Sequence, residues 1–114
     1  MRDKKTRQMN INIKTKNLDL TPSLRKFIDD KIGSLERVIK KWEEKGAVNI
    51  DFEVARTTKH HHKGEVFYAE INLSLGGSIL RAQKSAKDIR KAINMVKSVI
   101  KEEIAKLRGK EQEM

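Results

Sequence analysis

Hydrophobic and polar residues alternate along four segments of the chain, a pattern typical of β-strands with one buried side. The alternating segments are residues 9–14, 48–54, 67–75 and 78–82. The last two segments flank Gly76-Gly77, a dipeptide that favours a two-residue hairpin turn. We therefore predict four strands, of which the last two form a hairpin, and each strand turns one side toward a core.

Two longer segments carry apolar residues at the spacing of a single helix face. The first covers residues 22–45 and is predicted as one helix. Thr21 can cap its first turn, and Pro22 suits the first helical position because an N–H there would have no partner within the helix. The second helix is predicted to open at Ser85, with Asp88 placed three residues on as in a capping box.

The predicted elements follow the order β-α-β-β-β-α. Each helix has one apolar stripe and each strand has one apolar side, so both helices must cover the same face of the sheet. We therefore expect a two-layer α+β sandwich with a four-stranded sheet. Residues 9–108 form this single domain, preceded by a flexible basic arm, residues 1–8, and followed by a short charged tail, residues 109–114.

The composition indicates an anionic partner. The 114 residues include 26 Lys and Arg against 16 Asp and Glu, which gives a net charge of +10. Such an excess is typical of proteins that bind nucleic acid, a membrane surface or an acidic protein. Cysteine is absent, which excludes disulfides and thiol catalysis. No apolar run approaches the roughly 20 residues that span a bilayer, and no secretory signal is apparent, so we expect a soluble intracellular protein.

The excess positive charge gathers at the N-terminus and in the second helix. Residues 1–17 hold six bases and one acid, and residues 84–101 hold the same numbers. On the predicted second helix, five bases with no acid among them share a sector beside the apolar stripe: Lys87, Arg90, Lys97, Lys101 and Arg108. A row of bases can be simply a solvated face. A phosphate backbone, however, would relieve the repulsion within the row and release counterions.

Other candidate chemistry is sparse. His60, His61 and His62 could bind a metal, but consecutive residues face one ion only if the backbone loops, so a loop in solvent or against RNA is favoured. Tyr68 is either an ordinary surface tyrosine or a base-stacking residue, and Trp42 and the phenylalanines have core spacing. No motif of a serine hydrolase, phosphate loop or zinc protease is present. We therefore predict neither catalysis nor a cofactor or metal.

Several segments resemble one protein family. Residues 20–25 (Leu-Thr-Pro-Ser-Leu-Arg) and 31–36 (Lys-Ile-Gly-Ser-Leu-Glu) resemble the first helix of the ribosome hibernation-promoting factors, also described as ribosome-associated inhibitor proteins. Residues 69–71 and 79–82 are similar to the third and fourth strands of that family, and residues 88–94 are similar to its second helix. The resemblance extends over nearly the whole chain with the same element order.

The resemblance implies a fold like a double-stranded-RNA-binding domain and a non-catalytic role in translation. Members of the family dock on the small ribosomal subunit between head and body, overlap the messenger and transfer-RNA positions, and silence translation in starved or stationary cells. The chain resembles the short members, which lack a further ribosome-dimerising domain. We expect a cytoplasmic monomer that binds ribosomal RNA and neither DNA nor membranes. The residues expected to contact RNA are Arg25, Lys31, Lys84, Lys87, Arg90, Lys91, Lys97 and Lys101.

Two rival hypotheses stay open. A general RNA-binding module would act on structured RNA away from the ribosome, and bound messenger and transfer RNA would not compete with it. A protein-interaction module, in line with the older description of the family as sigma-factor modulators, would use the open face of the sheet. Its binding would respond to changes at Asn10, Asn49, Tyr68 or Asn72 and only mildly to salt.

Overall fold

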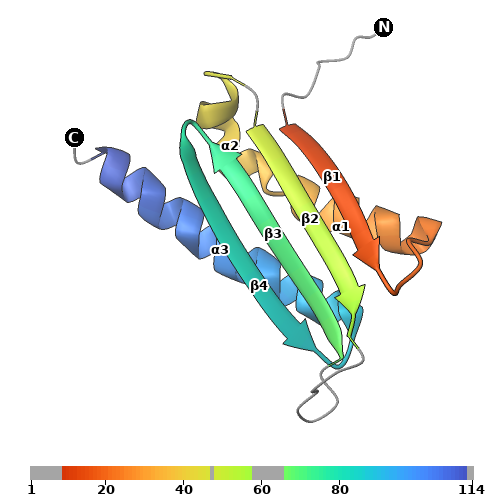
Figure 1. Ribbon diagram of the computed structural model, residues 1–114. Coiled ribbons are helices and arrows are strands. Elements are labelled where there is room, and N and C mark those ends of the chain that lie inside the picture. Colours follow the sequence, from red (N-terminus) through yellow and green to blue (C-terminus); the bar gives the residue numbers. More distant parts are fainter. Residues whose placement is uncertain (1–8, 47, 58–65, 113–114) are drawn as a thin grey trace, which may run out of the picture.

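The protein is described by a computed structural model that covers residues 9–46, 48–57 and 66–112. The elements in chain order are β1 (Met9–Lys16), α1 (Pro22–Gly33), α2 (Glu36–Glu43), β2 (Val48–Arg56), β3 (Phe67–Leu75), β4 (Ser78–Ala86) and α3 (Ile89–Gln112). Figure 1 shows the strands as one sheet with the helices behind it. The predicted arm, residues 1–8, and the three histidines, residues 60–62, lie outside the described residues.

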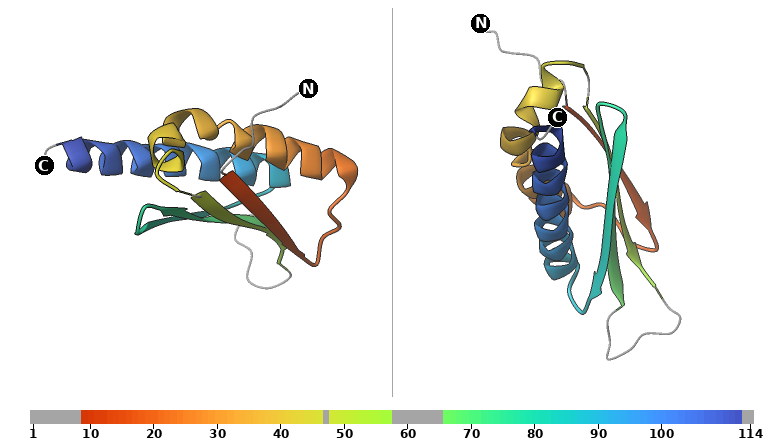
Figure 2. Two further views of the ribbon diagram at one scale, coloured as in Figure 1. Left: turned by 90° about the horizontal axis from the view of Figure 1, so that it is seen from above. Right: turned by 90° about the vertical axis from the view of Figure 1, so that its left-hand side faces the viewer.

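The sheet is mixed. Its strand order is β1-β2-β3-β4, with β1 parallel to β2 and the other two pairs antiparallel. Alternate side chains of each strand point to opposite faces, and the helices all cover the same face (Figure 2). The predicted two-layer α+β sandwich is confirmed.

The core lies between the sheet and the helices and is almost entirely aliphatic. Phe52 and Trp42 are its large aromatic members, and both are buried as their spacing predicts. Its largest fully buried side chains are Phe52, Ile28, Ile32, Leu35, Ile39, Ile50, Ile71, Leu73, Leu75, Ile93, Ile100 and Ile104. Because these come from both layers, burial of apolar surface fixes how the helices sit on the sheet.

The segment predicted as one helix, residues 22–45, is two helices. α1 ends at Gly33, and the next two residues, Ser34 and Leu35, form a tight turn. There the Leu35 N–H donates to the Ile32 carbonyl at 3.0 Å, a three-residue spacing in place of the four-residue spacing of an α-helix. A Gly-Ser pair is a common cause of a helix kink, because glycine is flexible and the serine hydroxyl competes for backbone groups.

After this turn, α2 carries Trp42 to the tip of the β3–β4 hairpin. A Cβ on Gly76 would lie 3.3 Å from Cδ1 of the indole, so the hairpin backbone is in close contact with the ring. Gly76 and Gly77 have φ angles of 48° and 93°, in the region that glycine adopts without strain. The predicted two-residue hairpin turn is therefore confirmed.

The boundary between the last strand and the last helix differs from the prediction. β4 continues to Ala86, paired with β3 as far as Phe67, and α3 begins at Ile89. The cap is Asp88, whose carboxylate accepts the Arg90 N–H at 2.9 Å, and not Ser85, which lies in β4. The strand was underestimated because a lysine occupies one of its inward positions. α3 also continues to Gln112, so the helix includes most of the predicted tail.

In the part of the chain that the structure describes, no helix is both long and apolar enough to cross a membrane. Among the same residues, no group of three or more potential ligand side chains could hold a metal ion.

Candidate nucleic-acid interface

One flank of α3 carries basic residues that face the α1–α2 pair. Arg90, Lys97, Lys101 and Arg108 follow one another at intervals of seven, four and seven residues, which places all four on one side of a helix. At the first of these positions, the Arg90 guanidinium donates to the Ser23 hydroxyl at 3.0 Å. This contact brings the start of α3 beside the start of α1.

The same flank meets α2 near the other end of α3. There the Arg108 guanidinium donates to the Val38 carbonyl at 2.9 Å, in a partly buried hydrogen bond. Because low residue numbers of α3 contact α1 and high ones contact α2, the α1–α2 pair and α3 run in the same direction. The basic flank therefore follows the line along which the α1–α2 pair meets α3, which we call the groove. Arg108 is occupied by this structural contact.

Four cations meet midway along the groove. Burial lowers the pKa of the Lys97 ammonium, and the positive charges of Lys31, Lys101 and Arg37 lower it further. These neighbours come from α1, α3 and α2 respectively, so the three helices bring like charges together. We refer to Lys31, Arg37, Arg90, Lys97 and Lys101 as the inter-helix cluster. An anion placed on this cluster would relieve its internal repulsion.

Phe27 of α1 supports two of these cations. The Arg90 guanidinium lies 5.1 Å from the ring centroid, and the Lys31 ammonium lies 5.5 Å from it. Both are within the range of cation–π attraction. The ring was predicted to pack in the core; it packs against the core cluster and is half-buried. Its exposed part positions the guanidinium, which the Ser23 hydroxyl also holds.

Four further cations expected at the interface lie away from the cluster. By the 100° turn per residue of an α-helix, Arg25 lies about 120° around α1 from Lys31. By the same geometry, Lys91 lies about 120° around α3 from Lys97. Lys87 lies in the turn before α3.

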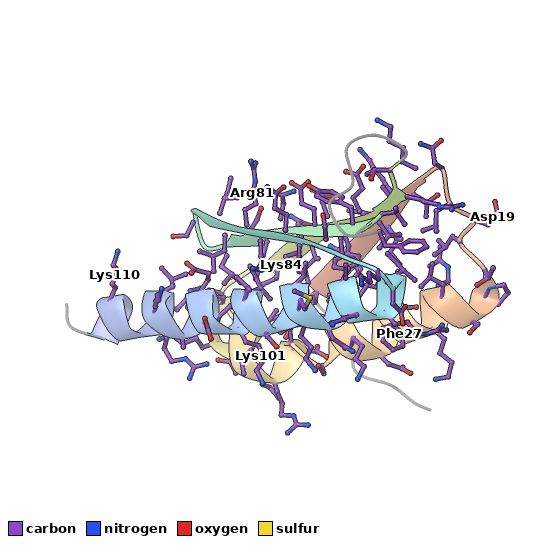
Figure 3. The ribbon with its side chains drawn as sticks, turned by 90° about the horizontal axis from the view of Figure 1, so that it is seen from below. Asp19, Phe27, Arg81, Lys84, Lys101 and Lys110 are labelled. Carbon is purple, nitrogen blue, oxygen red and sulfur yellow. The ribbon has the colours of Figure 1, made fainter. Side chains whose placement is uncertain are left out.

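Lys84 was grouped with the bases of the second helix as an RNA contact, but it lies on the edge strand β4. Its register is the inward one that Ala82 and Ala86 share, yet its side chain is exposed because β4 has no outer neighbour. Figure 3 shows Lys84 between the sheet and α3, and Lys101 on the other side of α3, next to α2. The two lysines therefore do not share one surface.

Sequence analysis missed Arg37. The bases of the first helix segment are interspersed with acids at spacings that suit intrahelical pairs, so the charge pattern gives no reason to single out Arg37. One such pair does form, between the Lys26 ammonium and the Asp30 carboxylate at 3.0 Å. The proximity of Arg37 to Lys97 depends on how α2 packs against α3, and no pattern within either helix reveals it.

The open face of the sheet is a polar network of another character. The Tyr68 hydroxyl lies 2.5 Å from a Glu70 carboxylate oxygen and 2.6 Å from the Gln83 side-chain oxygen. Arg81 donates to the Asn72 side chain at 2.6 Å. Burial first, and then the hydrogen bond to Glu70, raise the pKa of the Tyr68 phenol. The phenol has one proton, which it donates to one of these two oxygens, so the Tyr68 hydroxyl is part of the polar network on the open face.

A family profile and two solved structures match the chain. Residues 11–112 match the family described as Sigma 54 modulation protein / S30EA ribosomal protein. The Protein Y N-terminal domain of Thermus thermophilus is similar with a TM-score of 0.65 and 19% identity, over 87% of this chain and 94% of that one. A ribosomal subunit interface protein from Coxiella burnetii is similar with a TM-score of 0.68 and 20% identity, over 89% and 99%. No curated protein sequence matches the chain.

Proposed function

The chain belongs to the Sigma 54 modulation protein / S30EA ribosomal protein family, and on that premise we propose that it is a hibernation factor of the small ribosomal subunit. It binds between the head and body of the subunit, covers the messenger and transfer-RNA positions, and inhibits translation under stress or in stationary phase. The family is the one that the sequence resemblance predicted, and it is ribosome-associated and not enzymatic.

The observation that carries this proposal is the inter-helix cluster. Five cations from three helices face one groove, and one of them, Arg90, is fixed by both a hydroxyl and an aromatic ring. Phosphate contacts position a protein on RNA without reading its sequence, and folded RNA is recognised mostly through shape and backbone. A rigid cationic groove therefore suits a cleft walled by ribosomal RNA.

The printed names of the two similar structures support the same partner. One is a Protein Y domain, and the other is a ribosomal subunit interface protein. In this proposal the protein acts in the cytoplasm as a monomer. The more distant cations are peripheral contacts to the RNA: Arg25, Lys84, Lys87 and Lys91.

Competition on the ribosome tests the proposal. The purified protein is sedimented with vacant small subunits and with subunits that carry messenger and transfer RNA. We expect strong binding to vacant subunits and loss of binding to the loaded ones, because the two ligands occupy the same cleft. Equal binding to both would place the site elsewhere on the ribosome. Absence of binding to either would contradict the proposal and favour a partner away from the small subunit.

A charge-matched pair of variants tests the surface. Lys97→Glu with Lys101→Glu reverses the cluster, whereas Lys14→Glu with Lys16→Glu makes the same charge change on the exposed side of β1. We expect the first double variant to lose subunit binding at moderate salt and the second to retain most of it. Similar losses in both would show that net charge, and not the groove, determines binding.

A further inference from the structure

Lys97 occupies a confined position in the groove. Contacts across the helices lie on both sides of it along α3: Arg90 on Ser23 before it, and Arg108 on the Val38 carbonyl after it. Lys97 shares its flank of α3 with both arginines, so its side chain is half-buried between helices that these contacts hold together.

The charged side chains that act on Lys97 are cations, one from each of the three helices. Lys31 on α1, Arg37 on α2 and Lys101 on α3 all act on the ammonium. Together with burial they lower the pKa of Lys97, so that a larger share of it is a free amine near neutral pH than for an exposed lysine. The same three charges attract small phosphate-bearing molecules to the groove.

We propose that Lys97 is an acyl-acceptor site that reacts with small acyl phosphates, whose phosphate group the neighbouring cations hold. The neutral Nζ of Lys97 attacks the acyl carbonyl carbon, and a C–N amide bond forms. The C–O bond to phosphate breaks, and inorganic phosphate leaves with the electron pair. The proton of the attacking nitrogen passes to water. The product is an uncharged Nε-acyl-lysine, and no further co-reactant is needed.

Acylation would act on the cluster in two ways. It removes the central positive charge, and it places an acyl group in the groove where a phosphate would bind. This consequence for RNA binding rests on the proposed function, whereas the reactivity of Lys97 does not. A metabolic acyl phosphate would thereby lower the affinity of the protein for the small ribosomal subunit.

Site-resolved acylation kinetics test the proposal on the free protein. The protein is incubated with isotopically labelled acetyl phosphate at neutral pH, and mass spectrometry of peptides gives the initial rate at each lysine. We expect Lys97 to react several-fold faster than Lys91, which is exposed on another side of α3, and than Lys14 on the open sheet face. A rate at Lys97 equal to or below that of Lys91 would overturn the proposal.

Variants of Arg37 test whether the neighbouring positive charges cause the reactivity of Lys97. Arg37 is exposed, so its replacement should leave the fold intact. With Arg37→Gln we expect the rate at Lys97 to fall part of the way toward that of Lys91, because burial, Lys31 and Lys101 still act on Lys97, while the rate at Lys91 is unaffected. Arg37→Lys restores the charge and should restore most of the rate. If Arg37→Gln leaves the rate at Lys97 unchanged, the cationic surroundings do not activate it and the proposal fails.

A separate binding assay keeps the two proposals distinguishable. The acetylated protein and the unmodified protein are each sedimented with vacant small subunits. Fast acylation of Lys97 in a protein that never binds subunits would refute the proposed function and leave the reactivity standing. Normal subunit binding with slow acylation of Lys97 would refute the proposed reactivity and leave the proposed function standing. If the protein binds subunits and stoichiometric acylation at Lys97 leaves that binding unchanged, the regulatory consequence is wrong.

Discussion

The salt dependence of ribosome binding should become shallower when cations of the inter-helix cluster are neutralised. Each phosphate neutralised by a protein contributes about 0.7–0.9 to the slope of log affinity against log salt concentration. If each of the five cluster cations meets one phosphate, the cluster supplies a slope of about −3.5 to −4.5. Lys97→Gln with Lys101→Gln should therefore reduce the steepness by about 1.4–1.8.

The assay is the affinity of labelled protein for vacant small subunits, measured at constant Mg²⁺ from about 50 to about 200 mM KCl. Lys14→Gln with Lys16→Gln is the matched control, because it removes the same charge from the open face of the sheet. Circular dichroism of each variant checks the fold. The reasoning is refuted if the cluster variant keeps the slope of the parent, or if the control flattens the slope by the same amount.

Four substitutions test stability, each measured by urea unfolding. Phe27→Leu keeps apolar bulk but removes a ring that supports two cations, so it should cost about 1–2 kcal/mol; no measurable cost would contradict the cation–π contacts. Gly76→Ala should destabilise by about 1–2 kcal/mol, because its φ is +48° and a Cβ would crowd Trp42. Gly109→Ala changes a helical position with open space around it and should instead stabilise by about 0.5–1 kcal/mol. If both glycine substitutions changed the free energy of unfolding in the same direction, this backbone argument would be contradicted. The pKa of Lys97 is lower in the folded protein than its ordinary value of 10.5, so its charge opposes folding at pH 7 and less so as the pH rises through the folded pKa. Lys97→Gln should therefore be more stable than the parent at pH 7, with a gain that shrinks toward pH 10, and a constant gain would argue against this cause.

The cluster is positioned before any ligand arrives. Arg90 is held between a hydroxyl and a ring, and Lys31 rests on the same ring. Long basic side chains usually lose conformational freedom when they bind a phosphate, and prior restraint reduces that entropic cost. The repulsion around Lys97 acts in the same direction, because a bound phosphate relieves it. Both effects favour an extended anion over the empty groove.

Local patterns were sufficient to predict most of the fold. The alternation in β1, β2 and β3 and the Gly76-Gly77 turn are properties of consecutive residues, and the structure has them where they were predicted. Two boundaries were wrong for opposite reasons. The helix after Pro22 breaks at a Gly-Ser pair although its apolar stripe continues through the break. β4 continues past Ala82 because pairing with β3 overrides the polar character of Lys84.

The candidate site, like the fold, was predicted only in part from the sequence. The sequence alone determined that bases without acids line one flank of the last helix, because residues seven and four apart share a helix face whatever the helix packs against. The structure decided what that flank faces. In the structure Lys31 and Arg37 lie near Lys97. The Phe27 ring contacts the Arg90 guanidinium, and Lys84 lies on an edge strand. Such contacts join residues far apart in the chain, and they depend on how the helices bury their apolar stripes against the sheet and one another. The spacing of apolar and basic residues within one helix does not indicate which other helix packs against it, so only the tertiary structure could decide which charges meet.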